Sequence, residues 1–225
     1  MPALFIIFEG GEGSGKTTQL KALLTHLRST GRDAVETRDP GGTPIGKQIR
    51  GLLLDRENTR MGPATELLLY EASRAQLVHE VIRPALAAGR IVLCDRFTDS
   101  TVAYQGYGRG LDLELIARLN ALATEGLRPD LTFLLDLDPG VGLARATRRV
   151  TERQERHDRI EAEVLAFHQR VRTGYRAIAA AEPERVIVLD ASLGMAEIEG
   201  HIRPRVDELL RSSPRPAGPH LSAGG

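Results

Sequence analysis

The chain has 225 residues, with 30 basic and 30 acidic side chains, a formal net charge of zero and a single cysteine, Cys94. This length suits one α/β domain, and the balanced charge argues against a general nucleic-acid-binding surface. One cysteine excludes an internal disulfide and fits a reducing compartment, so we expect a cytoplasmic protein. No apolar segment approaches the ~20 residues that a membrane helix needs, so we expect no membrane partner.

Short apolar runs alternate with segments of helical periodicity. Several runs are apolar at nearly every position, which is typical of parallel strands covered on both faces. We predict strands at 4–8, 34–38, 91–94, 131–137 and 186–189. We predict helices at 16–30, 44–54, 64–88, 112–124, 139–148, 158–181 and 195–211. The alternation indicates an α/β fold, a doubly wound five-stranded parallel sheet with helices on both faces and ligands at the carboxyl ends of its strands.

No linker divides the chain before its last residues. We therefore predict one domain over residues 1–211. Residues 212–225 are rich in Pro, Gly and Ser, and we expect them to form a disordered tail.

The first strand runs into a glycine-rich loop and then into the first helix. The segment matches G-x-x-x-x-G-K-[ST] at every fixed position, in the strand-to-helix context that the motif requires. Glycines let the backbone turn its N–H groups toward phosphate oxygens, and the helix N-terminus adds further donors. Lys16 would bridge the outer phosphates, and the Thr17 hydroxyl would hold Mg²⁺. The predicted triphosphate site comprises Gly10, Gly11, Glu12, Gly13, Ser14, Gly15, Lys16, Thr17 and Thr18.

Charged residues end the second and third strands. Arg38 precedes a Pro-Gly-Gly turn, which places a cation at the ligand edge of the sheet. Asp95 leaves the strand beside the glycine-rich loop and is suited to hold Mg²⁺ or its waters. The next residue, Arg96, can grip an anionic acceptor or a transferring phosphoryl group. An ordinary turn and a structural Asp–Arg pair are the plain alternatives.

Two further segments suit a planar base. Tyr70 and Arg74 lie four residues apart, on one face of a predicted helix, where a ring can stack on a base beside a guanidinium. A core tyrosine with a surface arginine is the alternative. The stretch from Ser100 to Gly106 interleaves hydroxyls, an amide and an aromatic ring, although such a stretch also occurs at a plain helix start.

Six arginines lie between Arg145 and Arg159. Their density predicts either a solvated charged face or a closing flap, of about 145–159, whose guanidinium groups neutralise charge on a transferring phosphoryl group. The six histidines show no metal-ligand spacing.

Together these segments resemble the bacterial thymidylate kinases from Leu4 to about Leu210. Matching pieces are Phe8-Glu9-Gly10, Arg38 to Thr43, Tyr70 with Arg74, Asp95-Arg96, Ser100 to Gly106, Pro129 to Thr132, and Asp158 to Glu161. The resemblance implies transfer of the ATP γ-phosphate to dTMP for dTTP synthesis, with Mg²⁺ as cofactor. It also implies a homodimer, for which helices 64–88 and 112–124 could supply a buried face.

The resemblance also implies residue roles. Glu12 would meet the 3′-hydroxyl of dTMP, while Arg38 and Arg96 would grip its phosphate. Tyr70 would stack on thymine, and Arg74 would bond the base edge. Ser100, Tyr104 and Gln105 would line the pocket for the sugar and base. Tyr104 would also help exclude a 2′-hydroxyl. Ala191 would lie near the adenine of ATP.

The family divides by whether its catalytic arginine lies in the phosphate loop or in the flap. Gly13 stands where the first kind has arginine, so this chain resembles the second kind, and Arg149 and Arg153 are the candidate catalytic arginines. With Lys16, Asp95 and Arg96 they complete the predicted catalytic set. Asp39 departs from the usual Glu, and Tyr70 from the commoner Phe.

Two alternatives stay open on the residues alone. One is another nucleoside monophosphate or deoxynucleoside kinase. The other is a P-loop nucleotide switch or ATPase, although no Asn-Lys-x-Asp motif for reading a guanine base is present.

Overall fold

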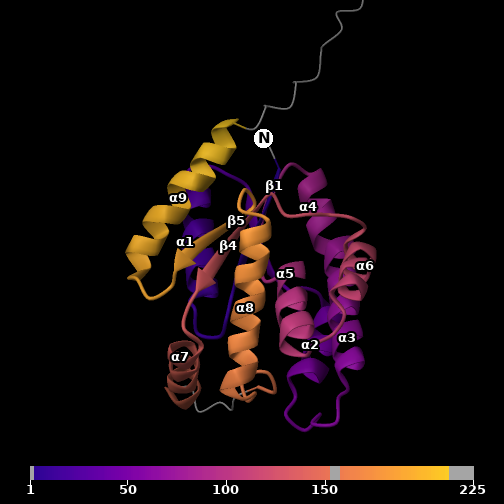
Figure 1. The fold of residues 1–225 in the computed structure, drawn as a ribbon. Helices are drawn as coiled ribbons and strands as arrows, with labels where there is room; N and C mark the ends of the chain where they lie inside the picture. The colour runs from indigo at the N-terminus through magenta and orange to yellow at the C-terminus, as the bar shows by residue number, and fades with distance from the viewer. Residues whose placement is uncertain (1–2, 153–157, 213–225) are drawn as a thin grey trace, which may run out of the picture.

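Five parallel strands form the centre of the computed structural model, which describes residues 3–152 and 158–212 (Figure 1). The strands are β1 (Leu4–Gly10), β2 (Ala34–Arg38), β3 (Ile91–Asp95), β4 (Leu131–Asp136) and β5 (Val186–Asp190). Their order is β2-β3-β1-β4-β5. The central strand is β1, with β2 and β3 on one side of it and β4 and β5 on the other. The loop after β1 therefore leaves the sheet at the switch point where ligands bind in such folds. The predicted fold class is confirmed.

Helices cover both faces of this sheet. The α-helices are α1 (Lys16–Ser29), α2 (Pro44–Leu54), α3 (Pro63–Leu77), α4 (Arg83–Ala87), α5 (Thr98–Thr101), α6 (Leu113–Thr124), α7 (Pro139–Glu152), α8 (Leu165–Ala181) and α9 (Met195–Ser212). Two π-helical turns are η1 (Val78–Ile82), between α3 and α4, and η2 (Val102–Gly108), directly after α5. No helix in the described ranges is long and apolar enough to cross a membrane.

Each face of the sheet has its own apolar core, because successive side chains of a strand point to opposite sides. Ile6 and Phe8 of β1 pack with apolar residues of α1 and α9. Phe5 and Ile7 pack with α3, η1 and α4 on the other side, where α8 and η2 also lie against Leu134 of β4. Figure 1 shows α1 and α9 side by side, with α3 and α4 across the strands from them.

Three predicted elements differ from the structure. The helix expected at 64–88 is divided by η1, where Pro84 has no N–H to donate to the preceding turn. The helix expected at 158–181 begins only at Leu165, because the carboxylate of Asp158 accepts the N–H groups of Ile160 and Glu161 and holds a turn instead. The helical segment 98–108 was not predicted as an element.

Two predicted segments reach beyond the described residues. Of the flap at about 145–159, the first part continues α7 to Glu152, and 153–157 lie outside the described ranges. Of the tail at 212–225, only Ser212, the last residue of α9, is described. The disordered tail stays a prediction, as does the single domain over 1–211.

Candidate active site

The glycine-rich loop turns sharply between β1 and α1. Gly13 and Gly15 have φ angles of 65° and 92°, which side chains rarely allow. The Nζ of Lys16 lies across the loop and donates to the carbonyl oxygens of Gly10, at 3.0 Å, and Gly11, at 2.8 Å. Burial, together with the nearby charge of Arg96, lowers the pKa of Lys16 to about 8. The loop thus holds a desolvated ammonium group on its own carbonyl oxygens at the N-terminus of α1, and a helix N-terminus suits phosphate.

Thr17 and Asp95, the two residues expected to hold Mg²⁺, are in contact. The Thr17 hydroxyl donates to Oδ2 of Asp95 at 2.6 Å, across the gap between α1 and the end of β3. No group of three or more His, Cys, Asp or Glu suited to a metal occurs among the described residues. Two protein oxygens still fit Mg²⁺, because this ion retains waters and takes phosphate oxygens as its other ligands.

Arg96 joins the loop to the neighbouring helices. Its guanidinium donates to Oε1 of Glu12 at 2.8 Å and to the hydroxyl of Tyr175 at 3.0 Å, and it lies 4.9 Å from the ring centroid of Tyr104. Its backbone has a φ of 72°, an uncommon conformation for a residue with a side chain. Such strain is found where the surrounding structure needs a side chain in one place.

Glu12 connects the loop to Arg96 and to η2. Besides Arg96, it accepts a hydrogen bond of 2.8 Å from the Tyr104 hydroxyl. Burial alone would raise the pKa of Glu12, but the charges of Arg96 and Lys16 and the bond from Tyr104 lower it to about 2. The group is therefore a carboxylate at neutral pH and can accept a sugar hydroxyl.

Sequence reasoning missed a buried cluster beneath this pair. Glu9 accepts the N–H of Phe97 at 2.8 Å, and its Oε2 lies 2.7 Å from the hydroxyls of both Ser100 and Tyr175. Burial is the main cause of its raised pKa. The signal available was a single carboxylate at the end of an apolar strand, which requires internal partners.

A cavity of about 80 Å³ opens beside Glu12. Six of the residues expected to bind dTMP share its wall, namely Tyr70, Arg74, Arg96, Ser100, Tyr104 and Gln105. Other residues of its wall had no predicted place in the pocket, namely Asp39, Pro40, Arg50, Leu54, Thr101, Asp158 and Ile160. The π-helical η2 brings Tyr104 and Gln105 to the same wall although they are adjacent in sequence.

Arg74 has a larger structural role than its predicted one. It is 1% exposed, and all five of its N–H groups have partners. Its ion pairs are with Asp39, at 2.6 Å, and Glu71, at 2.7 Å. The other three hydrogen bonds go to Asn120, Thr101 and the carbonyl oxygen of Phe97. A base carbonyl would have to share one of these donors.

Arg38 lies apart from the cavity. It is exposed at the end of β2, and it lines a second hollow with Thr17, Lys47 and Asp95. The structure therefore groups this arginine with the residues of the predicted metal site rather than with Tyr70.

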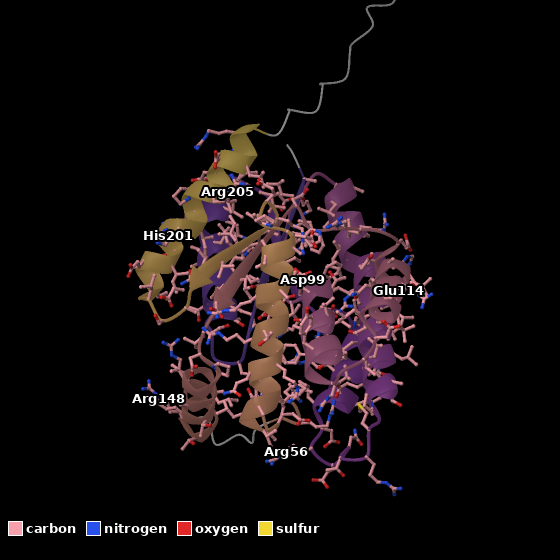
Figure 2. All side chains as sticks on the ribbon, viewed as in Figure 1. Arg56, Asp99, Glu114, Arg148, His201 and Arg205 are labelled. Carbon is pink, nitrogen blue, oxygen red and sulfur yellow. The ribbon has the colours of Figure 1, made fainter. Side chains whose placement is uncertain are left out.

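The arginines of α7 are only partly described. Arg145 donates to the carbonyl oxygen of Ala191 at 3.1 Å, which ties α7 to the loop after β5. Figure 2 shows Arg148 on the outer side of α7, where its side chain is 83% exposed. The side chain of Arg149 and all of Arg153 lie outside the described part of the chain.

Comparison with known proteins gives a consistent result. The family profile described as thymidylate kinase matches residues 8–202. A thymidylate kinase of Geotalea uraniireducens is 55% identical over 203 residues, which cover 90% of this chain and 95% of that protein. One of Solidesulfovibrio magneticus is 57% identical over 191 residues, covering 84% and 91% respectively. The crystal structure of thymidylate kinase from Ehrlichia chaffeensis superposes with a TM-score of 0.73 at 33% identity, over 92% of this chain and 99% of that one.

Proposed function

The chain belongs to the thymidylate kinase family and is an ATP-dependent dTMP kinase, and we propose that its two substrates meet across the Glu12–Arg96 pair. The observation that supports this placement most directly is the contact of 2.8 Å between these side chains. Glu12 belongs to the loop for the donor phosphates, and Arg96 lines the acceptor cavity. The product, dTDP, leads toward dTTP.

On the donor side, the loop from Gly10 to Thr18 binds the phosphates of ATP through backbone N–H groups and the ammonium of Lys16. Thr17 and Asp95 would hold Mg²⁺, which neutralises phosphate charge when bound. Ala191, whose carbonyl oxygen accepts from Arg145, would lie near the adenine.

On the acceptor side, the cavity beside Glu12 takes dTMP. Tyr70 stacks on the base, and Glu12 accepts the sugar 3′-hydroxyl. Arg96 from the cavity and Arg38 from the second hollow attract the acceptor phosphate. Because phosphoryl transfer depends on positioning and charge, these residues bring the acceptor oxygen to the γ-phosphate and exclude water. We also propose that Arg149 or Arg153 completes the charge neutralisation.

A substrate panel tests the assignment. With ATP and Mg²⁺, the purified protein should phosphorylate dTMP far faster than UMP, CMP, AMP or GMP. Equal turnover of several monophosphates would contradict the dTMP placement, and ATP hydrolysis indifferent to all of them would favour a switch or ATPase. Lys16→Ala should abolish turnover while dTMP binding persists, as measured by calorimetry.

The active unit is proposed to be a homodimer. Large apolar side chains are exposed on α2, α3 and α6, namely Ile45, Leu52, Leu68, Leu113, Leu115 and Leu122. Such apolar exposure supports an isologous contact through these helices. Light scattering after size-exclusion chromatography should give twice the mass of 24.6 kDa. The cytoplasmic location remains a prediction from the sequence.

A further inference from the structure

The buried carboxylate of Glu66 lies directly behind the acceptor cavity. Glu66 is 1% exposed on α3 and is not part of the cavity wall. Its Oε1 accepts Nε2 of Gln105 at 2.8 Å and Nε of Arg109 at 3.1 Å. Its Oε2 accepts Nη2 of Arg109 at 3.1 Å and Nη2 of Arg159 at 2.5 Å. The carboxylate is thus surrounded by donors.

These contacts determine which way the amide of Gln105 faces. A carboxylate facing two guanidinium groups is ionised and can only accept hydrogen bonds, so the NH₂ end of the amide must face Glu66. The other end, Oε1, belongs to a residue that lines the cavity. No described residue donates a hydrogen bond to this oxygen. Oε1 of Gln105 is therefore available to accept a hydrogen bond from a ligand.

We propose that Glu66 is a positioning residue that orients Gln105 so that its Oε1 reads the N3–H of the pyrimidine. This inference rests on the proposed placement of dTMP in the cavity. The pairing edge of thymine presents two carbonyl oxygens with N3–H between them, and only N3–H can donate to Oε1. Cytosine has a bare acceptor at N3, which would face Oε1 as a second acceptor. The oriented amide therefore selects thymine and uracil over cytosine.

Glu66→Gln is the informative variant, because the surrounding donors predict how its amide settles. Two guanidinium groups donate to Oε2 but only one, through Nε of Arg109, donates to Oε1, so the oxygen of the new side chain is favoured at the Oε2 position. Its NH₂ then faces Gln105, whose amide must flip to present Oε1 to it. The flipped Gln105 offers NH₂ to the cavity and would donate to N3 of cytosine.

The experiment measures kcat/KM for dTMP, dCMP and dUMP in wild type and variant. We expect Glu66→Gln to lower the dTMP:dCMP ratio by about tenfold or more, the usual effect of one hydrogen bond. The dTMP:dUMP ratio should not change, because both bases carry N3–H. Glu163→Gln is the matched control, since Glu163 binds Arg109 at 2.6 Å but does not contact Gln105, and its ratios should equal those of wild type.

The outcomes separate the possible failures. A Glu66→Gln enzyme that loses activity on all three substrates equally, or keeps the wild-type ratio, would overturn the inference. Should that variant show no cooperative thermal unfolding, Gln105→Met decides instead: a fall in dTMP:dCMP supports the reading by Oε1, and an unchanged ratio overturns it. Wild type without dTMP turnover would overturn the proposed function itself.

Discussion

The backbone of Gly13 in the phosphate loop rests directly on that of Gly142 in α7. A Cβ on Gly13 would lie 2.2 Å from the carbonyl oxygen of Gly142, and a Cβ on Gly142 would lie 2.2 Å from that of Glu12. Real Cβ atoms do not approach backbone so closely, and the φ of 65° at Gly13 disfavours any side chain there. An arginine at position 13 would therefore disturb both the conformation of the loop and its packing against α7. This packing supports a catalytic arginine located elsewhere.

Gly142→Ala should consequently loosen the loop from α7. The added methyl group forces a backbone shift, which typically costs about 1–3 kcal/mol of unfolding free energy. Because the displaced carbonyl belongs to Glu12, KM for ATP should rise together with the loss of stability. Urea unfolding and initial-rate kinetics measure the two effects.

Gly51→Ala is the matched control for this substitution. Gly51 also lies within a helix, but a Cβ there meets nothing within 4 Å. Removing its backbone freedom should leave stability unchanged or raise it by about 0.5–1 kcal/mol. Equal effects of the two substitutions would mean that contact with the loop is unimportant.

Arg74 should be among the most costly side chains to remove. It neutralises Asp39 and Glu71, whose pKa values are already raised by burial. Arg74→Met leaves these carboxylates buried without their cation, which costs about 3–5 kcal/mol. The exposed Arg118, 3.8 Å from Glu114, is the control: Arg118→Met should cost less than about 1 kcal/mol in the same urea titration. A small loss in Arg74→Met would show that the buried Asp39 and Glu71 do not depend on the charge of Arg74.

The parts of the site predicted from sequence are those encoded locally. The loop motif determines its own turn, and the parallel strands bring Asp95 beside Thr17 because strand ends meet at one edge of a sheet. The helical spacing of Tyr70 and Arg74 likewise placed both at the cavity wall. Each of these needs only a few neighbouring residues or the strand order.

The missed parts depend on contacts between distant segments. Glu9 and Tyr175 are 166 residues apart, and only the packing of α8 on the sheet brings them together. Gln105 and Arg159 both meet Glu66 because η2 and the turn before α8 converge on α3. A single sequence has no periodicity or motif that indicates such contacts. The five hydrogen bonds of Arg74 could not be predicted for the same reason.

Tyr104→Phe should separate the two roles of this residue. The hydroxyl donates to Glu12, whereas the ring lies against Arg96 and forms cavity wall. Loss of one hydrogen bond to a carboxylate costs about 1.5–3 kcal/mol, so kcat/KM for dTMP should fall by roughly ten- to a hundredfold. Preference for deoxyribose over ribose should persist if the ring itself excludes the 2′-hydroxyl. Comparing dUMP with UMP in the variant measures this, and a lost preference would assign the exclusion to the hydroxyl.

Binding of ATP should weaken in alkaline solution because of Lys16. Its pKa, lowered from 10.5 to about 8, means that the ammonium group loses its proton above pH 8 instead of above pH 10. The protonated form binds phosphate, so the Kd for a non-hydrolysable ATP analogue should be nearly flat below pH 7 and about double by pH 8. Well above pH 8 it should rise by about tenfold per pH unit until other groups titrate. Lys16→Arg is the control, because a guanidinium keeps its proton in this range and its Kd should not follow that curve. If both proteins show the same pH dependence, a group other than Lys16 governs binding of the phosphates.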